Sequence, residues 1–120
     1  MRGKIRGERV KCICFPVFAN YTVRVVLTPD VAKSRSARDS EIGNKYDGGD
    51  PLGIHAFNGN GDAWIFLPLT VEPGTVAHEC FHCINRMMQW IQADLENEVV
   101  AYHLGFLVTE VSNFLRRCRQ

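Results

Sequence analysis

The chain has 120 residues and a mass of 13.6 kDa, which predicts one compact domain spanning 1–120. Its 14 Lys and Arg residues nearly balance its 13 Asp and Glu residues, and the net charge of +1 argues against a nucleic-acid-binding protein. No apolar run approaches the roughly 18–20 residues that cross a bilayer, so we expect no membrane partner.

The cysteine content bears on the compartment. An odd number of cysteines, five, cannot all pair within one chain, and their spacing lacks the density of small secreted scaffolds. A basic start followed by an apolar stretch at 12–19 resembles a signal peptide, but Lys11 and Pro16 interrupt the apolar character. We therefore expect a cytoplasmic protein whose first apolar segment is a strand.

The first two thirds of the chain predict strands and a loop. Residues 10–18 and 21–27 are rich in β-branched and aromatic residues and predict one or two strands. The polar segment 31–51 predicts a long loop with one short helix at 31–38. Segments 52–57 and 62–69 predict a hairpin, because the Asn-Gly repeat at 58–61 tolerates the positive φ of tight turns.

The remaining residues predict two helices. The first is expected at 75–88, with Pro73 and Thr75 near its start, and the second from an N-cap at Asp94 to about Arg117. Together these elements predict an α+β fold. We expect a small, twisted, mainly antiparallel sheet with a hairpin, packed against the two C-terminal helices.

The first of these helices carries the sequence His78-Glu79-Cys80-Phe81-His82, which is an H-E-x-x-H motif. Residues four apart lie on one helix face, so the His78 and His82 imidazoles can converge on a single ion. Glu79 lies to one side of that face, where a carboxylate can act on water without being a ligand. The motif predicts a hydrolytic zinc site.

A catalytic zinc usually has three protein ligands and one open position. We predict Glu98, on the following helix, as the third ligand, and Asp94, Glu96 and His55 are the alternatives. For Glu98 to reach the ion, the first helix must end near Met88, or the second helix must cross it steeply.

A resemblance to a known family rests on two motifs, HECFH at 78–82 and NEVVA at 97–101. This part of the chain resembles the zincin-fold metallopeptidases of the gluzincin, thermolysin-like type. With its short length, it is also similar to small zincin-like proteins of phages and prophages. The resemblance implies zinc as the cofactor, with His78, His82 and Glu98 as its ligands and Glu79 as the general base.

The resemblance also implies how a substrate binds. Segment 62–69 would be the edge strand along which an extended peptide or protein substrate adds by β-augmentation. A phage-encoded protein of this type would act in the host cytoplasm. Two further residues are candidates for contacts with the substrate or the transition state: Tyr102, one helical turn after Glu98, and His55, on the hairpin.

A competing hypothesis concerns the cysteines. Cys80 and Cys83 form a C-x-x-C pair, which could be a redox pair or part of a zinc site completed by Cys12 and Cys14. Helical phase instead predicts that Cys80 and Cys83 face the core, where buried thiols behave as small apolar groups.

The sequence therefore predicts a zinc-dependent hydrolase, and a small metallopeptidase in particular. One alternative is a zinc-binding interaction or regulatory protein without efficient turnover. Another is an amidohydrolase that acts on a non-protein amide. A Glu79→Gln variant separates catalysis from binding, because it removes the base and keeps the histidines.

Overall fold

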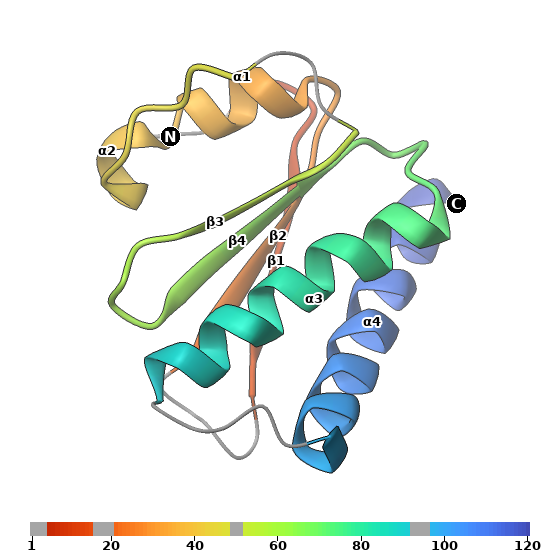
Figure 1. The fold of residues 1–120 in the computed structure, drawn as a ribbon. Coiled ribbons are helices and arrows are strands. Elements are labelled where there is room, and N and C mark those ends of the chain that lie inside the picture. The colour runs from red at the N-terminus through yellow and green to blue at the C-terminus, as the bar shows by residue number, and fades with distance from the viewer. Residues whose placement is uncertain (1–4, 16–20, 49–51, 92–96) are drawn as a thin grey trace.

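The computed structural model describes residues 5–15, 21–48, 52–91 and 97–120, and Figure 1 shows their arrangement. Within these ranges the strands are β1 (Arg9–Cys14), β2 (Thr22–Leu27), β3 (Ile54–Phe57) and β4 (Asp62–Leu67). They form one sheet in the order β1-β2-β4-β3. The β1–β2 and β3–β4 pairs are antiparallel, and the central β2–β4 pair is parallel. The expected α+β fold with a mainly antiparallel sheet is confirmed.

The prediction that segment 62–69 is an edge strand is wrong. Strand β4 lies in the interior of the sheet, with β2 on one side and β3 on the other. Its backbone hydrogen-bonding groups are thus used by two neighbours, which leaves no free edge for a further strand. The continuous apolar run at 63–67 is the signal of such a strand, because both of its faces are buried. The edge of the sheet on this side is β3.

The hairpin between β3 and β4 is confirmed. Gly59 and Gly61 adopt φ angles of +82° and +86°, a region that residues with a Cβ rarely enter. The Asn58 Oδ1 atom accepts hydrogen bonds from the backbone N–H groups of Asn60, at 2.8 Å, and Asp62, at 3.3 Å. This turn sets the register of the edge strand.

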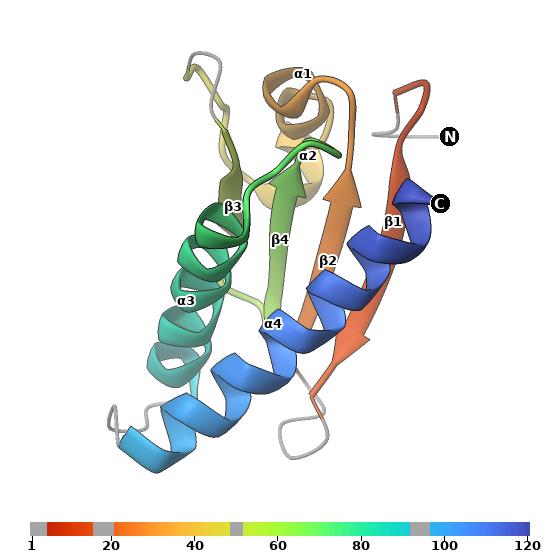
Figure 2. The same ribbon diagram turned by 90° about the vertical axis from the view of Figure 1, so that its right-hand side faces the viewer.

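Helices α3 (Pro73–Trp90) and α4 (Asn97–Arg119) cover one face of the sheet. Figure 2 shows α3 along β3 and β4, with α4 crossing toward β1. Both expected helices are confirmed, although α3 begins two residues early because Pro73 suits the first helical turn. The expected N-cap at Asp94 lies outside the described residues. Among the helices described, none combines the length and apolar character that crossing a bilayer requires.

The opposite face of the sheet is covered by two short helices, α1 (Val31–Ser36) and α2 (Asp39–Ile42), instead of the single helix expected at 31–38. Asp30 caps α1 by accepting a hydrogen bond from the Lys33 N–H at 3.0 Å. Helix α2 adds the apolar side chain of Ile42 to this face of the sheet. No local sequence pattern indicated this second helix. The smaller core on this face consists of Val26, Val31, Ile42, Ala56, Trp64 and Phe66.

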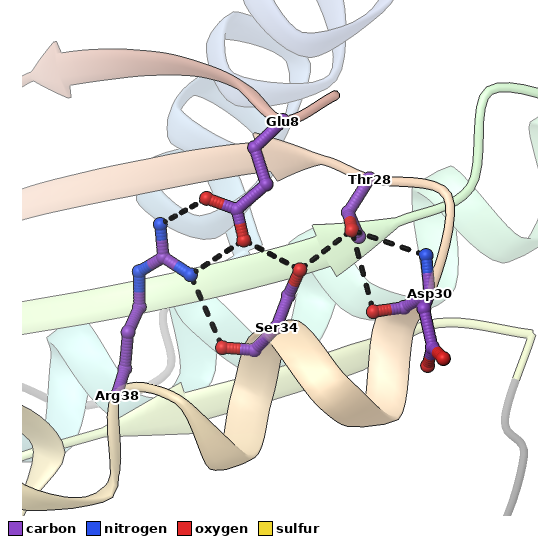
Figure 3. A network of polar contacts seen from close by, with 5 residues as sticks. All are labelled: Glu8, Thr28, Asp30, Ser34 and Arg38. Atoms are coloured by element: carbon purple, nitrogen blue, oxygen red, sulfur yellow. Dashed lines mark hydrogen bonds and ion pairs between the residues drawn. The ribbon is translucent and has the colours of Figure 1, made fainter. Parts of the chain in front are cut away.

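A buried polar network attaches α1 to the N-terminal segment, as Figure 3 shows. The Arg38 guanidinium donates to both carboxylate oxygens of Glu8, at 2.7 and 2.9 Å. The Ser34 hydroxyl donates to Glu8 Oε2 at 2.5 Å, and Thr28 Oγ1 lies 2.5 Å from the same hydroxyl. Every charge in the network therefore has a partner, as burial requires.

Candidate metal centre

The two histidines of the H-E-x-x-H motif lie one turn apart on α3, the helix that runs beside β3 (Figure 1). Their Nε2 atoms are 3.1 Å apart, with the rings nearly perpendicular. Two nitrogens bound to one tetrahedral zinc at about 2.0–2.1 Å are about 3.4 Å apart. A shift of a few tenths of an ångström would therefore let His78 and His82 hold one ion.

Glu79 lies beside these histidines but faces the sheet, and only 7% of its surface is exposed. Burial raises the pKa of its carboxyl, although the neighbouring His78 and His82 lower it in part. A carboxylate with a raised pKa accepts a proton from water more readily at neutral pH. Glu79 therefore has the environment that a general base needs.

Gly53, just before β3, lies in a crowded place next to Glu79. A Cβ at that position would lie 3.4 Å from the Cγ of Glu79. It would also lie 3.1 Å from the Cγ2 of Thr75 and 3.0 Å from the Cδ2 of Leu67. A side chain at residue 53 would therefore crowd Leu67 and Thr75, and it would touch Glu79 at an ordinary van der Waals distance.

His55 brings a third imidazole to the site from the edge strand. Its ring stacks on that of His82, with centroids 4.6 Å apart and planes 13° apart. The ligand atoms of His55, Glu79 and His82 all lie within 4.8 Å of one another. Burial and the nearby His82 lower the pKa of His55 to about 4, so its ring is neutral at pH 7 and can donate a lone pair.

The sequence had indicated His55 only as a possible contact or an alternative ligand. Strand periodicity places residues 53, 55 and 57 on one side of β3, but it does not say which element covers that side. The contact between α3 and β3 decides this, because it puts His55 level with His82. The pairing therefore depends on tertiary structure.

The group found among the described His, Cys, Asp and Glu side chains does not include Glu98. Helix α3 continues for eight residues beyond His82, about 12 Å, to its end at Trp90. Glu98 lies in the first turn of α4 with an exposed side chain. Tyr102 is 61% exposed, and its ring contacts that of His103 with centroids 5.1 Å apart. The alternatives Asp94 and Glu96 lie outside the described residues.

The cysteines lie on opposite faces of the sheet. Cys80 and Cys83 are fully buried in the larger core, as helical phase predicted. Cys12 and Cys14 are exposed, and the core residue Ile13 between them points the other way. A zinc site made from these four thiols would need them on one face, so the structure argues against that hypothesis.

Compared with protein-family models, curated proteins and solved structures, the chain shows no significant match. Its chemistry must therefore be inferred from its own residues. The ligand atoms of His55, Glu79 and His82 lie within 4.8 Å of one another, and His78 Nε2 lies 3.1 Å from His82 Nε2. Such nitrogen and oxygen donors are ligands that divalent transition metals, zinc among them, bind.

Proposed function

We propose that this protein is a zinc-dependent peptidase in which His78 and His82 hold the ion and Glu79 is the general base. One observation carries the proposal: the two imidazole nitrogens lie 3.1 Å apart beside a buried carboxylate. Ordinary surface histidines would have no reason to adjoin a carboxylate with so little exposure.

For the third ligand we propose His55 in place of Glu98. His55 belongs to the group whose ligand atoms lie within 4.8 Å of one another, and it is held there by the sheet. Glu98, at the start of α4, is the alternative that the sequence favours. Three ligands leave the fourth position of a tetrahedral ion open.

Each residue of the site has a defined task in the reaction. When bound, zinc supplies a Lewis acid and lowers the pKa of water at the open position. The Glu79 carboxylate accepts a proton from the attacking water and returns it to the leaving amine. The apolar surroundings of Glu79, which raise its pKa, make both transfers feasible near neutral pH.

The free edge of β3 offers a place for the substrate. Strand β3 has a neighbour only on the β4 side within the described sheet, and α3 runs beside it. An extended peptide that adds to this edge would pass His55 and the H-E-x-x-H face. This supports a peptide as the substrate, bound at β3 instead of at 62–69.

The test combines metal content with hydrolysis. We expect about one zinc per chain in the wild type and none in His82→Ala. Peptide hydrolysis should fall by about 10²–10⁴-fold in Glu79→Gln, which keeps the metal ligands. If Glu79→Gln cleaves peptides as fast as the wild type, the proposed mechanism is wrong. If the wild type binds zinc but cleaves nothing, the chain is a zinc-binding interaction or regulatory protein.

A further inference from the structure

The edge strand β3 borders a hollow of about 400 Å³ whose lining includes His55 of the candidate site and Arg86 of α3. Ile54 and Ala56 line it from the face of the sheet that α1 and α2 cover. His55 and Phe57 line it from the alternate positions of the same strand. The hollow therefore wraps around the free edge, where an added strand would lie.

The charged side chains that line this hollow are two arginines, Arg35 and Arg86, and the His55 ring beside them is neutral at pH 7. Arg35 is already neutralised, because its Nη1 atom lies 2.8 Å from the Asp39 carboxylate. No Asp or Glu side chain belongs to the described lining. The local charge is therefore positive, although the chain as a whole is nearly neutral.

Arg86 is the arginine of this lining that has no ion-pair partner among the described residues. It is exposed, and its described side-chain hydrogen bond goes to the neutral Gln89 Oε1 atom at 3.5 Å. No ion pair of the described residues includes it. It follows His82 by four residues, so it extends from the same helix face, about 6 Å farther along α3.

We propose that this site selects peptides with an acidic side chain, and that Arg86 recognises the carboxylate. This inference rests on the proposed function, because it takes His78 and His82 as the point of cleavage. An extended peptide advances about 3.3 Å per residue, so the 6 Å step places the Asp or Glu about two residues from the cleaved bond. Phe57 and Tyr46 line the same hollow and give it an apolar part beside the arginines.

The first experiment maps cleavage sites in a mixed peptide library with the zinc-loaded full-length chain. We expect Asp and Glu to be enriched about two residues from the cleaved bond, on one side only. Arg86→Glu should reverse the preference toward Lys and Arg and slow cleavage of acidic peptides by about fivefold or more. The matched control is Arg116→Glu, the same charge change on the exposed last turn of α4, which should leave the preference unchanged.

The outcomes separate this inference from the proposed function. Cleavage without an acidic preference, or with one that survives in Arg86→Glu, overturns the inference and leaves the peptidase intact. If the wild type cleaves nothing, the peptidase proposal is overturned, and binding of a labelled Glu-rich decapeptide and its Lys-rich counterpart becomes the test. Selective binding of the acidic peptide that is lost in Arg86→Glu supports the inference. Equal binding of the two peptides, or no binding, overturns it.

Discussion

The Tyr21 hydroxyl donates a hydrogen bond of 2.8 Å to the backbone carbonyl of Cys83, and both residues are fully buried. Tyr21 immediately precedes β2, whereas Cys83 directly follows His82 in the middle of α3. This bond therefore fastens the candidate metal centre to the central part of the sheet. A site that must hold ligands within a few tenths of an ångström benefits from such an anchor.

Removal of this hydroxyl should weaken the fold measurably. Tyr21→Phe keeps the ring, which packs against Phe15, Phe57 and Trp90, and loses only the hydrogen bond. We expect the free energy of unfolding to fall by about 1 kcal/mol, measured from the urea midpoint at an unchanged m-value. Tyr102→Phe, at an exposed position, is the matched control and should change stability little. Equal effects of the two variants would contradict the anchoring role.

The network around Glu8 predicts how stability depends on pH. Burial by itself would raise the pKa of Glu8, but hydrogen bonds from Arg38 and Ser34 outweigh it and hold the pKa below the ordinary value of 4.5. The stabilisation is thus present above about pH 4.5 and is lost as the pH falls through the lowered pKa. Glu8→Gln should cost about 3–5 kcal/mol at pH 7, because it leaves the buried Arg38 without its counter-ion.

The measurement is chemical unfolding of wild type and Glu8→Gln at a series of pH values. The difference between the two proteins should shrink below pH 4, as the wild-type carboxylate takes up its proton. Ser34→Ala, which removes one hydrogen bond to the same carboxylate, offers a milder variant if Glu8→Gln does not fold. A difference that stays constant from pH 7 to pH 3 would refute the ionic role of Glu8.

Gly53 should be intolerant of even a methyl group. The Cβ of Gly53→Ala would meet Leu67, Thr75 and Glu79 at 3.0–3.4 Å, and such overpacking typically costs about 1–3 kcal/mol.

The matched control for this substitution is Gly105→Ala on α4. A Cβ there would meet nothing within 4 Å, and alanine favours a helix over glycine by about 1 kcal/mol. Thermal unfolding should therefore shift in opposite directions for the two variants. If both variants shift thermal unfolding in the same direction, the space around residue 53 is not restricted.

Zinc titration can decide the third ligand. Zinc should raise the midpoint of thermal unfolding of the wild type, because the folded state binds it preferentially. We expect His55→Ala to weaken the affinity by at least about tenfold, and Glu98→Ala to change it by less than about threefold. The reverse order would assign the third position to Glu98 and return His55 to a substrate contact.

The thiols should fall into two classes of reactivity. Cys12 and Cys14 are exposed, so they should react with an alkylating reagent within minutes in the native protein. Burial raises the pKa of Cys80 to about 12 and raises that of Cys83 as well, so these two should react only on unfolding. Mass spectrometry of a time course identifies each site. Rapid native labelling of Cys80 would contradict its place in the core.

Local patterns in the sequence were sufficient for much of this structure. The hairpin turn at 58–61, the strands that flank it and the two long helices follow from residue preferences over a few neighbouring positions. The convergence of His78 and His82 follows in the same way, because four residues complete about one helical turn. All of these are relationships within a single element.

Only the tertiary structure decided which elements are neighbours. The parallel pairing of β2 with β4 puts β4 inside the sheet and leaves β3 as the edge, so the expected substrate strand was misassigned. The same packing brings His55 to His82, which no pattern within one element of the sequence could show. Strand order and helix contacts minimise the apolar surface that the whole chain exposes to water. This total depends on residues far apart in the sequence, so no short segment determines it.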